Sequence, residues 1–309
     1  MTESLRPINL GGILDRGVQV FRARVLIFIG LGSITGIAHF AYQHVTAYPA
    51  STLAGSTNSG PRFESPGAAF VSWLALAGLG AIVQAATCYA TSKVILGEEV
   101  SIRKAFGAFT SKVLLLIWLT ILQGFYAGWP FLVATFVSVI AASPGSAEQG
   151  VILLLGLIPC VVLYTRYALA FPAIVIERFT PQASIERSIN LGEGGRRRVF
   201  WGVIVPYLPA LMLTYGVPGL MNALRNSNAF PSVNSFLVTG IDGIVGLTSA
   251  LVFTPYVSIV LTLLYYDQRM RREGFDVERM MEAAGLDESA TPTGRDGPTI
   301  ITGAGESQA

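Results

Sequence analysis

A few polar and charged side chains lie inside long apolar runs of this chain, where such groups are costly and therefore informative. The clearest case is Arg166, which lies about ten residues before Glu177 and so roughly 15 Å of helix from the end of its run. An arginine at mid-membrane costs at least about 2.5 kcal/mol on insertion scales, so its side chain should face the protein interior or extend to the interface. A guanidinium there suggests a site for an anionic ligand or a lipid headgroup.

A structural interpretation of Arg166 also stays open, and it is the one we favour. The guanidinium can clamp carbonyl groups that Pro172 frees from helical hydrogen bonding, or it can pair with Asp267 or Asp15. If the role is structural, Arg166→Ala should lower the folding yield. Normal expression with loss of a transport or lipid phenotype would favour the ligand site.

Four further polar residues are candidates for binding or structural roles. Gln84 and Gln123 lie within apolar runs, where each can join a polar network or make one interhelical hydrogen bond. Glu177 and Asp267 lie at the ends of their runs. With Asp15 and Glu98 they either form an acidic ring at the interface or are simply solvated there.

The residues predict no enzyme, no metal site and no cofactor. The two histidines, His39 and His44, are five apart, whereas a helical metal-binding pair needs a spacing of three or four. The chain contains no HExxH, GxSxG or GxxxxGK[ST] motif. Cys88 and Cys160 both lie in apolar runs and predict buried packing.

Composition places all these residues in a membrane protein. The 309 residues are 52% hydrophobic and 13% charged, with a mean hydropathy of +0.56, whereas soluble domains average about 25% charged. A spanning helix needs about 20 apolar residues, which favours an all-α polytopic bundle of six transmembrane helices. The six runs are approximately Val25–Thr46, Ala68–Thr91, Val113–Ala142, Gly150–Ile176, Val199–Asn222 and Gly243–Tyr266.

The positive charges predict the orientation of these spans. All but three of the 21 Lys and Arg residues fall in the two termini and in the connections after the second and fourth spans; the exceptions are Arg62, Arg166 and Arg225. Since lysines and arginines next to membrane spans stay on the cytoplasmic side, both termini should be cytoplasmic in a multi-pass protein of the cytoplasmic (inner) membrane. The net charge of +2 and the dispersed basic clusters do not favour nucleic acid as a partner.

A basic amphipathic segment precedes the spans three times at nearly fixed spacing. Apolar and small residues share one helical face in each copy, and a cation keeps its register as Arg16, Lys104 and Arg187. The face comprises Leu14, Gly17, Val18, Phe21 and Val25 in the first copy, Ile102, Ala105, Phe106, Phe109 and Val113 in the second, and Ile185, Ser188 and Ile189 in the third.

The repeat predicts three parallel units, each an interfacial helix followed by a hairpin of two spans, around a pseudo-threefold axis. The units cover about 10–97, 98–177 and 180–267 of a membrane domain at 1–276, and the tail at 277–309 should be largely disordered from 285. We expect the apolar faces to lie in the acyl boundary and the cations to meet anionic headgroups. Ordinary basic loops and amphipathic linkers remain the alternative.

Small residues and prolines predict where the spans approach each other and bend. GxxxG pairs occur at Gly32 and Gly36 and at Gly124 and Gly128, and they suggest close helix packing. Prolines interrupt the later spans and should kink them. They are Pro159, Pro172, Pro206, Pro209, Pro218 and Pro255.

Three segments resemble the uncharacterised bacterial six-helix membrane proteins that are often labelled as the membrane domain of glycerophosphoryl diester phosphodiesterase. The segments are Leu10–Arg16, Tyr164–Glu177 with Ser184–Ser188, and Leu264–Asp276. The resemblance implies that Arg166, Pro172, Glu177 and Asp267 belong to the family pattern. It implies a membrane module without the hydrolase, because the soluble barrel and its histidines and metal-binding carboxylates are absent from this sequence.

Three functions therefore stay open. The first is a non-enzymatic membrane module or scaffold in envelope or lipid-related processes, with the lipid bilayer and an unknown membrane protein as partners. The second is a transporter or channel for an anionic or amphipathic solute with Arg166 at its site, which requires a cavity reaching that residue. The third is a membrane-embedded enzyme, which requires Asp15, Glu177 and Asp267 to converge.

Overall fold

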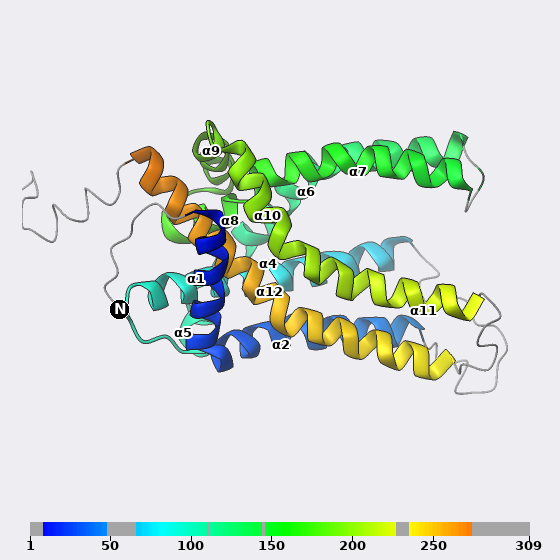
Figure 1. The fold of residues 1–309 in the computed structure, drawn as a ribbon, viewed down its shortest axis with the longest axis horizontal. Coiled ribbons are helices and arrows are strands. Elements are labelled where there is room, and N and C mark those ends of the chain that lie inside the picture. Colours follow the sequence, from blue (N-terminus) through cyan, green and yellow to red (C-terminus); the bar gives the residue numbers. More distant parts are fainter. Residues whose placement is uncertain are drawn as a thin grey trace, which may run out of the picture.

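The computed structural model describes residues 9–47, 66–109, 112–141, 143, 146–226 and 235–273, and their regular secondary structure is entirely helical. Six segments are long and apolar enough to cross a membrane. The predicted all-α polytopic bundle is therefore confirmed, and its long helices run side by side in Figure 1. The predicted disordered tail and Arg62 lie outside the described residues.

The six spans are built from more helical pieces than the apolar runs predict. They are α2 (Val25–Ala47), α4 (Pro66–Ile95), α6 (Val113–Ala141), α7 (Ala147–Tyr167) with α8 (Ala170–Ile176), α10 (Arg196–Leu211) with the π-turn η2 (Met212–Gly216) and α11 (Val217–Asn226), and α12 (Ser235–Glu273). Three shorter helices precede the hairpins: α1 (Leu10–Ala23), α5 (Ile102–Gly107) and α9 (Pro181–Gly192).

The last helix is much longer than its apolar run. It begins eight residues earlier, at Ser235 instead of Gly243, and continues to Glu273. Asp242 therefore lies inside α12 and not at its N-terminus as its place in the sequence suggests. Hydropathy marks only the apolar part of a helix. The helical backbone hydrogen bonds can continue through the polar residues that flank this part.

The spans form a closed ring. Each span packs against the next one along the chain, and α12 closes the ring by packing along α2. The centre is filled because α4 contacts α12 directly and α8 contacts both of them. The order of a short helix followed by two spans occurs three times, as the repeat predicts, while the threefold axis itself stays a prediction.

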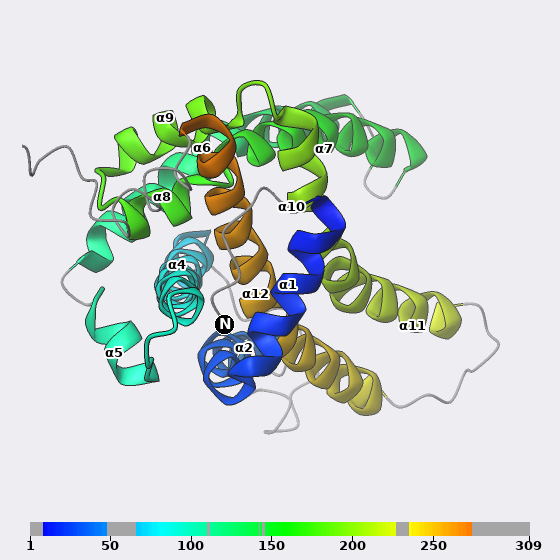
Figure 2. The ribbon, with the colours of Figure 1, turned by 60° about the vertical axis from the view of Figure 1, so that its left-hand side comes forward.

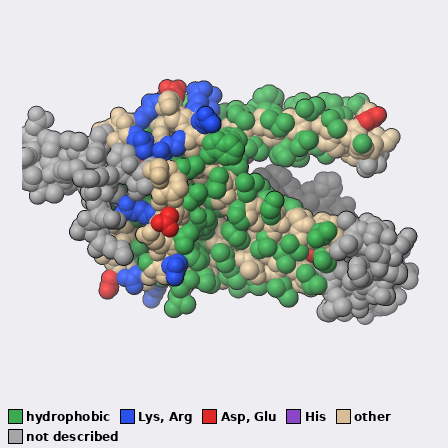
Figure 3. Space-filling view, in the orientation of Figure 1, with side chains coloured by type: hydrophobic (Ala, Val, Ile, Leu, Met, Phe, Trp, Pro, Cys, Tyr) green, Lys and Arg blue, Asp and Glu red, His purple; other side chains and the backbone are tan. Residues whose placement is uncertain are grey.

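One end of the molecule carries the charges, and we call it the basic end. It comprises α1, α5, α8, α9, the start of α10 and the end of α12 (Figure 1). Figure 3 shows Lys and Arg gathered at this end, while hydrophobic side chains cover the long helices beyond it.

The apolar faces of the short helices pack against protein instead of lipid, contrary to our expectation. Helix α1, capped by Asn9, buries Ile13, Gly17 and Val20, and the Cα of Gly17 lies against Val260 of α12. Helix α9, capped by Thr180, likewise buries Ile185, Ser188 and Leu191. For α1 this surface is the apolar part of α12 around Tyr256, Val260 and Leu263. Val18 is 41% exposed, so the predicted face is also rotated.

The same stretch of α12 is the centre of the core. Between Val257 and Tyr265 all nine residues are buried, so this helix has no lipid-facing side there. Figure 2, which turns the basic end forward, shows α12 passing between α1, α4 and α8. A helix segment that is buried on every side contacts neighbours on every side and holds them in fixed positions.

Glycines permit a close contact of the ring, between α2 and α12. A methyl group on Gly32 would lie 2.7 Å from the carbonyl oxygen of Leu251, and one on Gly36 would lie 2.9 Å from Leu247. The first GxxxG therefore packs as predicted. The second does not, because Gly124 and Gly128 have open space where a methyl would be; Gly156 makes the close contact of α7 with α6 instead.

Gly32→Ala should destabilise the protein by about 1–3 kcal/mol, because the added methyl forces the α2 and α12 backbones apart. Gly124→Ala is the matched control. It should be neutral or stabilising by up to about 1 kcal/mol, since alanine favours helix and meets no neighbour. Thermal unfolding midpoints in one detergent measure both, and equal midpoints would contradict the contact.

Candidate functional site

The fourth span breaks where its proline requires it. Pro172 has no N–H to offer the carbonyl four residues earlier, and α7 ends at Tyr167 just before that carbonyl. Ser188 of α9 closes the gap: its hydroxyl donates to the Arg166 carbonyl at 2.9 Å and accepts the Leu169 N–H at 3.2 Å. Gln123 of α6 donates to the Tyr167 carbonyl at 2.6 Å.

These contacts correct our expectation for Arg166. Its side chain is exposed, and it pairs with neither Asp267 nor Asp15. The depth of roughly 15 Å assumed one continuous helix to Glu177 at about 1.5 Å per residue. Because the helix breaks at Ala168, Arg166 lies level with α9 at the basic end. The carbonyl clamps are Ser188 and Gln123.

The two glutamines differ in their hydrogen bonding. Gln123 is buried and makes the expected interhelical hydrogen bond. Gln84 is half-buried in α4 and makes no hydrogen bond to any residue the structure describes. They do not share a polar network there.

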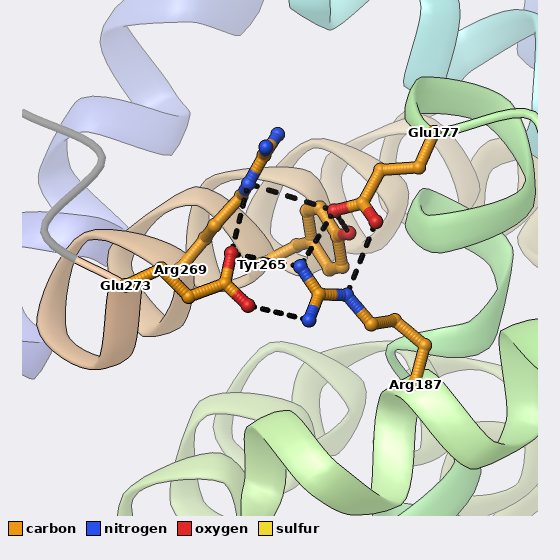
Figure 4. Close-up of polar contacts among 5 residues, drawn as sticks. All are labelled: Glu177, Arg187, Tyr265, Arg269 and Glu273. Carbon is orange, nitrogen blue, oxygen red and sulfur yellow. Dashed lines mark hydrogen bonds and ion pairs between the residues drawn. The ribbon is translucent and has the colours of Figure 1, made fainter. Parts of the chain in front are cut away.

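Glu177 is the centre of an ion-pair cluster that joins three helices (Figure 4). Arg187 of α9 donates from Nε and Nη2 to its two oxygens at 3.1 and 3.0 Å, and the Tyr265 hydroxyl also donates to it. Arg187 pairs in addition with Glu273, and Arg269 lies 3.5 Å from Glu177 and 3.2 Å from Glu273. The cluster fixes the end of α8 and α9 to α12.

The charges within this cluster are matched, which favours a structural role. Two arginines face two glutamates, with Glu177 12% and Arg187 22% exposed. The hydrogen bond to Glu273 raises the pKa of Arg187 most, and Glu177 adds to it while burial opposes it. Arg187 is therefore charged at every accessible pH, and its loss would leave Glu177 partly buried and short of a partner.

Asp267 forms a second cluster two residues further along α12. Its carboxylate is 2% exposed, and its Oδ2 lies 3.0 Å from Nε of both Arg198 and Arg271. Since Arg198 lies in the first turn of α10, this pair holds the start of α10 against the end of α12. The sequence offered Arg166 as one possible partner of Asp267, whereas the structure pairs Asp267 with Arg198 and Arg271.

A basic cavity of about 630 Å³ lies beside the second cluster, between the starts of α1 and α10 and the end of α12. Leu10 and Trp201 form its apolar lining, and Gly194 and Gly195 expose backbone to it. Its charged and polar lining consists of Arg197, Arg198, Arg271, Arg272, Glu193 and Gln268. Four arginines against a single lining carboxylate make it a place for an anion.

The candidate carboxylates do not converge. Asp15 is exposed and bonds Gln19, while Glu98 pairs with Lys93 at 2.6 Å. Among the described residues no group of three His, Cys, Asp or Glu is placed to hold a metal ion. Arg166 does not line the basic cavity, nor a smaller one beside Arg16 and Asp267.

In comparisons with known proteins, no family model, no curated protein sequence and no solved structure matches this chain.

The basic cavity was not predicted from the sequence, although the sequence contains one signal for it. The run Gly192–Gly195 precedes three arginines, Arg196–Arg198, at the start of α10. A glycine turn before a basic helix start is also a pattern that presents backbone N–H groups to an anion.

Ser188→Ala should destabilise the protein by about 1–3 kcal/mol, because it leaves two backbone groups at the α7–α8 break without a partner. Ser184→Ala is the matched control on the same buried helix face. Its hydroxyl bonds only the Thr180 carbonyl, which also accepts the Ser184 N–H.

Arg166→Ala completes this comparison and should change stability by less than about 0.5 kcal/mol, since the side chain is exposed. Thermal unfolding in detergent ranks the three variants. A loss for Arg166→Ala as large as that for Ser188→Ala would restore the clamp role of Arg166.

Proposed function

We propose that this chain is a non-enzymatic integral membrane module of the cytoplasmic membrane, with its basic end and both termini inside. In this proposal the basic end binds anionic lipid headgroups and the module serves as a scaffold in lipid or envelope-related processes. The resemblance to the six-helix membrane-domain family belongs to the same proposal, since it implies a module without hydrolase chemistry.

The observation that carries the proposal is the separation of charge along the molecule. On the face that Figure 3 shows, the lysine and arginine side chains gather at the basic end, and apolar side chains cover the spans. Several of these cations are exposed on α1, α5 and α10, among them Arg24, Arg103, Lys104 and Arg196. Exposed cations at the headgroup level attract anionic lipid by about 1 kcal/mol each.

The filled centre of the ring supports a scaffold more than a transporter. Direct packing of α4, α8 and α12 occupies the basic-end half of the axis. The transporter alternative needs a cavity at Arg166, and the enzyme alternative needs Asp15, Glu177 and Asp267 together. Arg166 lines neither of the two cavities described above, and among the described residues these carboxylates form no cluster placed to hold a metal ion.

Cysteine labelling in intact cells tests the orientation. In a background with Cys88 and Cys160 replaced by alanine, Glu99→Cys should resist a membrane-impermeant maleimide, because Glu99 is exposed at the basic end. Glu148→Cys, exposed at the start of α7 on the opposite end, should react when the reagent can enter the periplasm. The reverse pattern would reject the proposed orientation.

Lipid enrichment tests the binding. Reconstituted in mixed phosphatidylglycerol and phosphatidylcholine, the protein should retain phosphatidylglycerol preferentially, as measured by mass spectrometry after detergent extraction. The double change Arg103→Glu with Lys104→Glu should lower that preference by roughly fivefold or more, from about 1 kcal/mol per exposed cation.

The control for lipid enrichment keeps the charges and changes the side chains. Arg103→Lys with Lys104→Arg alters the same two exposed positions of α5 and should retain the preference of the natural protein. Equal lipid retention by the reversed and the conserved pair would reject headgroup binding as the role of this surface.

A further inference from the structure

Two arginines of the basic cavity are not used by the ion pairs that hold the fold. Arg198 and Arg271 pair with Asp267, whereas Arg197 and Arg272 have no acidic partner among the described residues. Both line the cavity from opposite sides, one on α10 and the other at the end of α12. The charge directed at the cavity is therefore in excess of what folding neutralises.

Backbone donors add to this charge at the start of α10. The helix has 16 residues, and its N-cap, Gly195, supplies no side-chain acceptor for the first N–H groups. The free N–H groups and the helix dipole together attract an anion at such an end. Gly194 has φ +77°, and a methyl added there would lie 3.1 Å from Nη2 of Arg272, so the turn brings this guanidinium onto the backbone.

Gln268 is the independent sign that a ligand belongs here. Its side chain lines the cavity but is only 2% exposed, and its Nε2 has no hydrogen-bond partner among the described residues. It lies against Gly195, where an added methyl would be 2.7 Å from its Oε1. A buried amide donor without an acceptor costs about 1–3 kcal/mol, which an anion oxygen at this point would recover.

We propose that the cavity binds a phosphate group. Arg197, Arg272, Nε2 of Gln268 and the first turn of α10 offer donors, which suits a tetrahedral oxyanion with more than one charge, and Glu193 is the single carboxylate in the lining. The volume of about 630 Å³ exceeds that of a bare phosphate ion, and Leu10 and Trp201 line it with apolar surface. The ligand is thus a phosphate that carries an organic group or lies next to acyl chains.

The phosphate can come from a lipid headgroup or from a soluble phosphate ester. The lipid source rests on the proposed function, since it needs the basic end at the headgroup level of the membrane. The cavity opens where the spans α10 and α12 meet the interface, so phosphatidic acid, with its exposed phosphomonoester, is the probe that matches it best.

Native mass spectrometry of the purified full chain tests the site. The probes are phosphatidic acid, phosphatidylglycerol and diacylglycerol, and thermal unfolding with inorganic phosphate covers the soluble source. We expect phosphatidic acid to bind most tightly and diacylglycerol least. Arg197→Gln and Arg272→Gln should each weaken phosphatidic acid binding about tenfold, and Gln268→Leu about fivefold.

Arg196→Gln is the matched control, since Arg196 is exposed next to Arg197 but its side chain does not line the cavity. It should leave the affinity for phosphatidic acid unchanged. Unfolding midpoints close to that of the natural protein confirm that the exposed variants fold, and Arg197→Lys should restore part of the binding lost in Arg197→Gln.

The outcomes separate this site from general attraction at the basic end. Stabilisation by inorganic phosphate that Arg197→Gln abolishes, without preference for phosphatidic acid, supports the phosphate site with a soluble ligand. Equal loss of binding in Arg196→Gln and Arg197→Gln, or no binding of any phosphate probe, overturns it. In that case the protein can still prefer phosphatidylglycerol through Arg103 and Lys104. The proposed function would then stand although the proposed phosphate site is rejected.

Discussion

The packing of the basic-end half of α12 is the constraint on which the rest of the structure depends. Its residues from Val257 to Tyr265 are buried on every side and contact the short helices as well as the spans. Lipid gives no hydrophobic driving force between helices, so close fit must hold the ring together. The bare backbone at Gly32 and Gly36 permits that fit along α2, and the apolar face of α1 completes it at the interface.

The same helix carries the polar groups that order the basic end. Within nine residues it presents Tyr265, Asp267, Gln268, Arg269 and Glu273. Together they contact Glu177 at the end of α8, Arg187 of α9 and Arg198 of α10, and Gln268 lines the basic cavity. A half-buried charge is costly unless it is paired, so these side chains select one arrangement of α8, α9 and α10. Charges that are paired hold the fold, and Arg197 and Arg272, which are left over, are available to a ligand.

Buried backbone N–H and C=O groups, like buried charges, are costly unless they have a partner. The break at the proline of the fourth span leaves backbone groups without helical partners, and Ala168 and Leu169 at the break are buried from water. Ser188 and Gln123 supply the missing bonds from α9 and α6, which explains why two small neutral side chains matter where a charged one, Arg166, seemed the natural clamp.

Sequence by itself determined the six apolar runs, the segregation of the cations, the order of short helix and hairpin, and the close contact at Gly32 and Gly36. Each of these is a local property, since a run must be long enough for the bilayer and a glycine bares its own backbone. Only the tertiary structure decided the partners of Glu177 and Asp267, the exposed position of Arg166, the open faces of Gly124 and Gly128, and the basic cavity. Those depend on where a broken helix turns and on which helix continues past its apolar run. Both are settled by contacts between residues far apart in the sequence, such as Tyr265 with Glu177 and Tyr256 with Leu14.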